Sequence, residues 1–259
     1  DQFRRCHLIS PVGSLNREIL RLALPSIFAN LTVPLVGMVD IAVAGHLDSS
    51  AAALIGGVSI GSMMFDVLYW NFGFLRAGTG GLTSQAFGRE DWTDCVRTLL
   101  RGLATALAIS LAMIALQRPF CHLFFCFVDC SEEVRNLAVK YFTIRILCSP
   151  ATMSLMVVRG WFIGMQDTFS SMVTDTVVNV VNIVASIALS VGIPALGIRG
   201  MGFEGVATGT VAAQYLGLLV ASVIMLFKYS GTFSGRLSRA SLKGTFSGGK
   251  MHEFFSVNK

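Results

Sequence analysis

The sequence predicts an all-α fold, a polytopic membrane protein built as a bundle of six transmembrane helices. Composition is the first observation behind this prediction: of 259 residues, 53% are hydrophobic and 14% are charged, and the mean hydropathy is +0.66. Soluble domains carry about 25% charged residues. The shortage of charge therefore indicates a membrane protein before any motif is considered.

Six apolar runs supply the second observation, since a spanning helix needs about 20 mostly apolar residues. They cover residues 19–45, 52–77, 97–117, 134–158, 168–193 and 205–227. The second run either ends at 77 or continues as one long helix through the glycine-rich stretch 78–88. Short segments join the runs, and the longest covers residues 118–133. We therefore divide the chain into an N-terminal segment (1–18), a six-helix lobe (19–228) and a Gly/Ser/Lys-rich linker (229–259).

Positive charge is distributed unequally along the chain. With the N-terminus inside, the cytoplasmic side would carry Arg4, Arg5, Arg17, Arg21, Arg89, Arg97, Arg101 and Arg159 plus the basic tail, and the outer side mainly Arg118, Arg135, Lys140 and Arg199. Because cytoplasmic loops are enriched in Lys and Arg, we expect both termini in the cytoplasm and the chain in the cell (cytoplasmic) membrane. The net charge of +5 is thus a topology signal, and no nucleic-acid partner is expected.

The segment CHLFFCFVDC (121–130) combines three cysteines with His122. Its spacing lacks the C-x2-C and H-x3-H pairs of zinc sites, so we interpret these cysteines as ordinary apolar residues. The sequence also lacks an HExxH motif and paired histidines. We therefore expect no metal site, no cofactor and no enzymatic activity.

An acid stands in the middle of the first apolar run, VPLVGMVDIAVAGH (33–46). A carboxylate such as Asp40 at the centre of a bilayer helix costs about 2.5–3.5 kcal/mol, and intramembrane ionisable groups are usually functional. Pro34 has no N–H for the carbonyl of Asn30, which predicts a helix kink. Freed carbonyls beside a buried acid are the parts of transporter cation sites. The alternative is a structural kink beside a packed, permanently protonated Asp40.

Further polar side chains interrupt the other runs. Asp66, Asn71 and Arg76 lie in the second run, and Thr208, Thr210 and Gln214 lie in the sixth. In the fifth run, one helical face carries Asp175, Asn179, Asn182, Ser186 and Ser190. Such a stripe indicates a wet cavity or ion path, whereas a single polar residue is often only an interhelical hydrogen bond. Asp66 and Asp175 remain open to a structural or interfacial interpretation.

Several longer stretches resemble the multidrug and toxin extrusion (MATE) family, in its DinF-like branch. They are REILRLALPSIFANLTVPLVGMVDIAVAGHL (17–47), YWNFGFLRAGTGGLTSQAFGRE (69–90), RGWFIGMQDT (159–168), NVVNIVASIAL (179–189) and GFEGVATGTVAAQY (202–215). The resemblance implies a transporter of two six-helix lobes that exports organic, often cationic compounds in exchange for H+ or Na+. It also implies that Asp40 is the coupling-ion carboxylate and that Asn182 matches the family's fifth-helix asparagine.

Two departures refine this expectation. Many relatives have an acid where this chain has Ser186, which favours H+ over Na+ as the coupling ion. The sequence also ends where the family's seventh helix would begin, so we expect only the N-terminal lobe, with a missing C-terminal lobe as its partner. The lipid bilayer and a small organic substrate are the other expected partners.

The mechanism expected from these residues starts with Asp40 taking up H+ from outside, which bends the first helix at Pro34 and displaces substrate. Asp175, Asn179, Asn182 and Ser186 would supply hydrogen-bond partners. Asp66, Asn71, Thr208 and Gln214 would line the substrate cavity. Two alternatives stay open: a lipid-linked saccharide flippase, disfavoured because only Arg76 stands out as an intramembrane cation, and an inactive truncated lobe.

Overall fold

The structure is a computed structural model that describes residues 27, 34–47, 51–193 and 197–233. Its helices are Pro34–His46, α2 (Ala51–Trp70), α3 (Phe74–Gly88), α4 (Trp92–Ala115), α5 (Gln117–Phe124), α6 (Glu132–Arg145), α7 (Ser149–Gly164), α8 (Thr168–Val191), α9 (Phe203–Lys228) and α10 (Ser230–Phe233). A 3-10 turn, η1 (Ile146–Cys148), joins α6 to α7. This confirms the predicted all-α architecture.

Five helical stretches are long and apolar enough to cross a membrane: 51–88, 92–115, 132–164, 168–191 and 203–228. The apolar helix Pro34–His46 is shorter, and the remainder of the first predicted span lies outside the described residues. Pro34 is the first described residue of that helix, so the predicted kink concerns residues that also lie outside the description.

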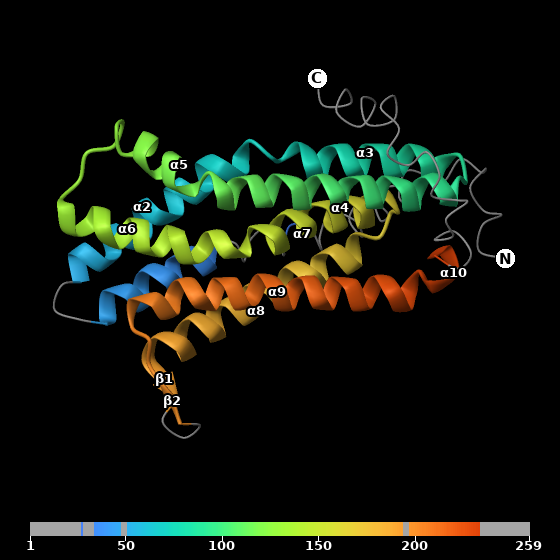
Figure 1. The fold of residues 1–259 in the computed structure, drawn as a ribbon. Helices are drawn as coiled ribbons and strands as arrows, with labels where there is room; N and C mark the ends of the chain where they lie inside the picture. The colour runs from blue at the N-terminus through green and yellow to red at the C-terminus, as the bar shows by residue number, and fades with distance from the viewer. Residues whose placement is uncertain (1–26, 28–33, 48–50, 194–196, 234–259) are drawn as a thin grey trace.

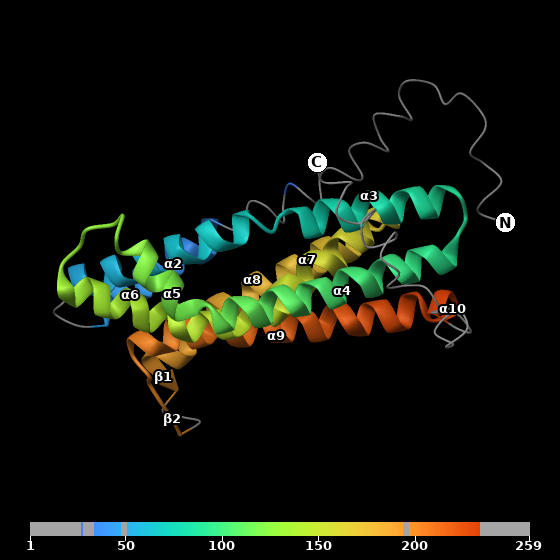
Figure 2. The same ribbon diagram turned by 45° about the horizontal axis from the view of Figure 1, so that its top comes forward.

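The helices form an elongated bundle (Figures 1 and 2). In both views α5 and the starts of α2 and α6 lie at one end, together with a hairpin of β1 (Gly192–Ile193) and β2 (Ile198–Arg199). The α3–α4 and α7–α8 turns and α10 lie at the other end. The long helices therefore alternate in direction, as expected for consecutive spans.

Two predicted spans are interrupted. The second continues to Gly88, but a three-residue turn at 71–73 separates α2 from α3, so it is neither a helix ending at 77 nor one continuous helix. The fourth changes to η1 before α7, where Pro150 cannot donate an N–H to the carbonyl of Ile146. The predicted connections 118–133 and 192–205 contain α5 and the β1–β2 hairpin.

Local sequence explains where several helices begin. The side chains of Asp91, Ser131 and Asp167 accept hydrogen bonds from the backbone N–H of Asp94, Val134 and Ser170, at the starts of α4, α6 and α8. Acceptors at this position satisfy N–H groups that have no partner within the helix.

Small residues bring two helix pairs close together. On α9, Gly205, Gly209 and Gly217 face Leu189, Ser186 and Val178 of α8. On α3 and α7, a Cβ added to Gly164 would lie 2.6 Å from Cβ of Thr83, and one added to Gly80 would lie 3.2 Å from the carbonyl oxygen of Gly160. Because glycine leaves room for close backbone approach, these contacts set the spacing of the helices around the polar residues.

The α7–α8 turn is held to the end of α9 by Asp167. This buried carboxylate accepts a hydrogen bond from Tyr229 at 2.8 Å and pairs with the Nζ of Lys228 at 2.8 Å. Burial opposes the charge of Asp167, but the bonds from Lys228, Ser170 and Tyr229 outweigh it and hold the pKa of Asp167 below its usual value of 3.8. The ionised carboxylate thus stabilises this end of the bundle.

Stability should consequently fall in acid. A group with a depressed folded-state pKa contributes stability that is present above 3.8 and is lost as the pH falls below 3.8 through the folded-state pKa. Thermal unfolding followed between pH 5 and pH 2 should show this loss in the wild type and a smaller one in Asp167→Asn. Equal acid sensitivity of the two proteins would contradict the assignment.

Candidate functional site

A cavity of about 330 Å³ lies between the Pro34–His46 helix, α2, α6, α7, α8 and α9. Its lining residues are Val36, Gly37, Asp40, Ser62, Asp66, Arg145, Arg159, Asp175, Val178, Asn179, Asn182, Thr210 and Gln214. Each of these helices contributes at least one polar side chain. The cavity is therefore the place where the polar residues of the bundle meet.

Asp40 is the most enclosed acid of this cavity, with 4% of its surface exposed. Its Oδ1 is buried and accepts no hydrogen bond from the residues that the structure describes. Arg145 lies within electrostatic range of Asp40 and Asp66. A buried carboxyl group with an unused oxygen is suited to reversible binding of a proton.

A hydrogen-bonded chain of neutral side chains lies on α8 and α9. The hydroxyl of Ser186 donates to Oδ1 of Asn182 at 3.0 Å, and Nδ2 of Asn182 donates to the hydroxyl of Thr210 at 3.3 Å. All three residues are buried, and the facing glycine Gly209 permits this approach. Both functional groups of the Asn182 amide are thereby satisfied, which fixes its orientation.

The two arginines that line the cavity have different partners, an acid for Arg159 and two hydroxyls for Arg145. Nε of Arg159 and Oδ1 of Asp175 form an ion pair at 2.5 Å, with 18% and 19% of these side chains exposed. Arg145 donates from Nη1 to the hydroxyls of Ser62 and Tyr141, both at 3.0 Å. Arg159, counted from sequence among the cytoplasmic charges, lies within α7 and lines the cavity.

The structure brings together most of the residues singled out from the sequence. Asp40, Asp66, Asp175, Asn179, Asn182 and Gln214 line the cavity, and Ser186 contacts it through Asn182. Two predicted members do not line it. Asn71 lies at the α2–α3 turn, where its Nδ2 donates to the carbonyl of Val67 at 2.6 Å. The hydroxyl of Thr208 donates to the carbonyl of Glu204. Thr210, two residues further along α9, lines the cavity instead.

Four polar or charged lining residues are absent from the sequence-based site: Ser62, Arg145, Arg159 and Thr210. Arg145 lies inside the predicted span 134–158, and a charged residue within a span is a sequence signal for a functional position. Arg159 directly follows that span and therefore resembles an ordinary interfacial charge. The partners of each arginine depend on how α6 and α7 pack against α2 and α8.

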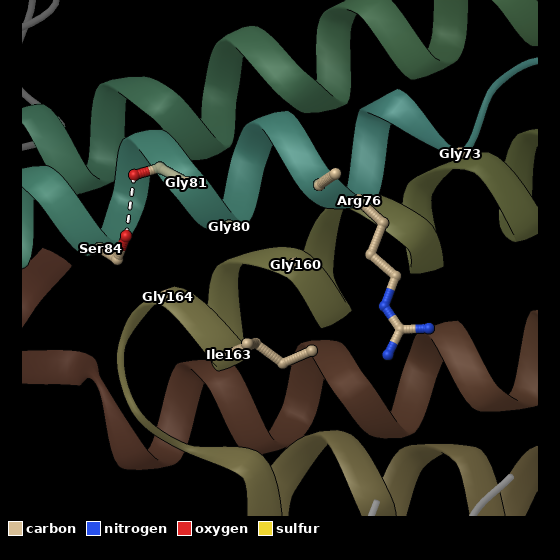
Figure 3. A pocket seen from close by; sticks show the side chains of 9 residues that line it. Gly73, Arg76, Gly80, Gly81, Ser84, Gly160, Ile163 and Gly164 are labelled. Atoms are coloured by element: carbon tan, nitrogen blue, oxygen red, sulfur yellow. Dashed lines mark hydrogen bonds between the residues drawn. The ribbon is translucent and has the colours of Figure 1, made fainter. Parts of the chain in front are cut away.

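Arg76 occupies a neighbouring region. It borders a hollow between α3 and α7 that is lined mainly by glycines, and its side chain leaves α3 on the side facing α7 (Figure 3). A further pocket joins Arg76 to Asp66 and Arg159. Arg76 thus adds positive charge beside the central cavity without lining it.

Metal chemistry has no evident site in the described part of the chain, where no group of three or more His, Cys, Asp or Glu side chains could hold a metal ion. Cys95, Cys121, Cys126, Cys130 and Cys148 are free thiols.

Comparison with known proteins places this cavity in a family context. A family model described as MatE matches residues 25–188. The chain is 35% identical over 246 residues to the DNA damage-inducible protein F of Escherichia coli (strain K12). This match covers 94% of this chain and 52% of that protein. It is 25% identical over 216 residues to the probable multidrug resistance protein NorM of Thermotoga maritima, covering 83% of this chain and 45% of that protein. The chain spans about half the length of the curated relatives it matches.

Solved structures give the same result for the fold. A crystal structure of MATE in the bent conformation matches with a TM-score of 0.72 at 18% identity, covering 94% of this chain and 53% of the other. The eukaryotic MATE transporter AtDTX14 matches with a TM-score of 0.75 at 17% identity, covering 93% and 51%. These likenesses confirm the predicted fold, a helical lobe equal to about half of a MATE-type transporter.

Proposed function

Because the chain belongs to the MatE family, we propose that it forms one lobe of a proton-coupled antiporter that exports organic compounds across the cytoplasmic membrane. A second lobe of similar size would complete the cleft, as the doubled length of the relatives suggests. The cavity described above would then be one wall of a central passage that opens alternately to the two sides.

The observation that carries this proposal is the enclosure of Asp40 beside the Asn182–Ser186–Thr210 chain. Binding a proton at Asp40 changes the charge of a cavity that also contains Arg145 and Asp66. With Asp40 protonated, the cavity becomes less negative and binds a cationic group less strongly. Proton uptake and release of a cationic substrate would thereby be coupled, which is the requirement for antiport.

Proton coupling is favoured over sodium coupling by two features. Ser186 supplies a hydroxyl where a second carboxylate would help to hold Na+, and its hydroxyl donates to Asn182. Arg145 places a positive charge within electrostatic range of Asp40. A fixed cation opposes the binding of either ion, but Na+ also needs a set of oxygen ligands, whereas a proton bound covalently to the carboxyl group does not.

The decisive experiment reconstitutes the protein with both lobes in liposomes and imposes either a pH gradient or a sodium gradient. Movement of an organic cation driven by the pH gradient at zero sodium is expected. Movement that follows only the sodium gradient would refute proton coupling.

A lipid-linked saccharide flippase remains the second candidate, and one observation favours it more than the sequence did. Arg145 and Arg159 both line the cavity, so Arg76 is not the sole cation available for a pyrophosphate group. However, the Arg159 charge is already matched by Asp175. Flipping of a pyrophosphate lipid without a proton gradient, in the same liposomes, would favour this candidate.

We also propose that both chain termini are cytoplasmic, which places the end of the bundle with α5 and the β1–β2 hairpin outside. Cys126 is exposed at that end, after α5. A membrane-impermeant maleimide should label Cys126 in intact cells when Cys121 and Cys130 are replaced by serine. Glu90→Cys, in the α3–α4 turn of a Cys126→Ser protein, should be labelled only after permeabilisation. The reverse pattern would invert the topology.

A further inference from the structure

Arg145 is a cation of the cavity whose charge no acid meets directly. The guanidinium lies over the ring of Phe65, 4.8 Å from its centroid, and one of its nitrogens, Nη1, holds the hydroxyls of Ser62 and Tyr141. Its Nε is buried and has no hydrogen-bond partner among the described residues. None of the ion pairs in the described part of the chain includes Arg145.

This arrangement is unusual for an enclosed charge, because buried cations are normally paired. Arg159, in the same cavity, follows the rule through Asp175. The guanidinium presents five donors in a planar fork that matches the two oxygens of a carboxylate or phosphate. Arg145 therefore retains donor capacity at a cavity wall, held in place by two hydroxyls and an aromatic ring.

Asp66 supplies the opposite charge. It lines the same cavity, and it lies one helical turn after Ser62 on α2, on the face that Arg145 contacts. The charges of Arg159 and Asp175 cancel in their ion pair. When Asp40 carries a proton, Arg145 and Asp66 are thus the two opposite charges of the lining that have no direct ion-pair partner among the described residues.

We propose that the cavity binds amphoteric organic compounds, with the anionic group of the ligand on Arg145 and its cationic group toward Asp66. This inference rests on the proposed export function and specifies its substrate class. A carboxylate or phosphate on the ligand would use the free donors of Arg145, which a purely cationic compound leaves unmatched.

The test compares two dyes that differ by one methyl group. Rhodamine 110 carries a cationic xanthene and a free carboxylate, and rhodamine 123 is its methyl ester, with the cation alone. Binding to the purified protein with both lobes is measured by fluorescence polarisation. A charge-assisted hydrogen bond should make rhodamine 110 bind about tenfold more tightly than the ester.

Replacing Arg145 isolates the anionic subsite. In Arg145→Gln the two dissociation constants should come within about twofold of each other, because the ester affinity does not depend on the guanidinium. Arg145→Lys should keep part of the preference and guards against a loss caused by misfolding. Arg135→Gln is the matched control, since Arg135 lies on the same helix and stacks on an aromatic ring, Phe125, at 4.9 Å, but lies outside this cavity; it should keep the full preference.

Equal binding of both dyes to the wild type, or a preference unchanged in Arg145→Gln, would overturn the anionic subsite. Neither result would touch proton-coupled export, which the gradient experiment tests separately.

Discussion

Asp40→Asn is expected to abolish proton-coupled export by the protein with both lobes, while insertion into the membrane and folding are retained. Asparagine has nearly the size of aspartic acid but cannot bind or release a proton. With a pH difference of two units, one coupled proton supplies about 2.7 kcal/mol, enough for a concentration gradient of ~100-fold. The variant should lose this accumulation and allow at most downhill movement.

Asp66→Asn is the matched control for Asp40→Asn. Asp66 lines the same cavity but is exposed. Its replacement should weaken binding of a cationic substrate while leaving the dependence on the pH gradient intact. Uphill transport by Asp40→Asn at the wild-type level would remove Asp40 from the mechanism.

Arg159→Met is expected to cause the largest loss of stability, at most about 3–5 kcal/mol in the free energy of unfolding, because it leaves Asp175, whose side chain is 19% exposed, as a partly buried charge without its ion-pair partner. The measurement is reversible unfolding in mixed micelles at neutral pH. The double variant Arg159→Met, Asp175→Leu should recover most of the loss, since replacing both members of a buried pair is often close to neutral.

Lys140→Met is the matched control. Lys140 pairs with Glu204, but 55% and 40% of these side chains are exposed, so breaking this pair should cost less than about 1 kcal/mol. If Arg159→Met costs no more than Lys140→Met, then the Arg159–Asp175 pair does not hold α7 against α8.

The features of the site that could be predicted from the sequence are those that depend on one helix alone. Asp175, Asn179 and Asn182 share one face of α8 because helical periodicity alone puts them there, and all three line the cavity. The isolated position of Asp40 in an apolar run likewise marks it without any knowledge of packing. Five of the six predicted apolar runs correspond to helical stretches long and apolar enough to cross a membrane, and the first run contains the shorter helix Pro34–His46.

What could not be predicted depends on contacts between helices or on breaks within them. The sequence suggests that Asn71 lines the cavity, but Asn71 lies in the α2–α3 turn and its amide donates a hydrogen bond to the backbone carbonyl of Val67. Thr208 and Thr210 are indistinguishable by residue type, and only the packing of α9 on α8 decides that Thr210 meets Asn182. Arg159 of α7 pairs with Asp175 of α8, and this contact between two helices cannot be derived from the distribution of charge along the sequence.

Proton release on substrate binding is the most direct measurement of the central claim that Asp40 exchanges its proton for substrate. The purified protein with both lobes is held in weak buffer, and the pH is recorded while an organic cation is added. The account predicts release of about one proton per bound substrate in the wild type and none in Asp40→Asn. The same release from both proteins would show that the coupling proton resides elsewhere.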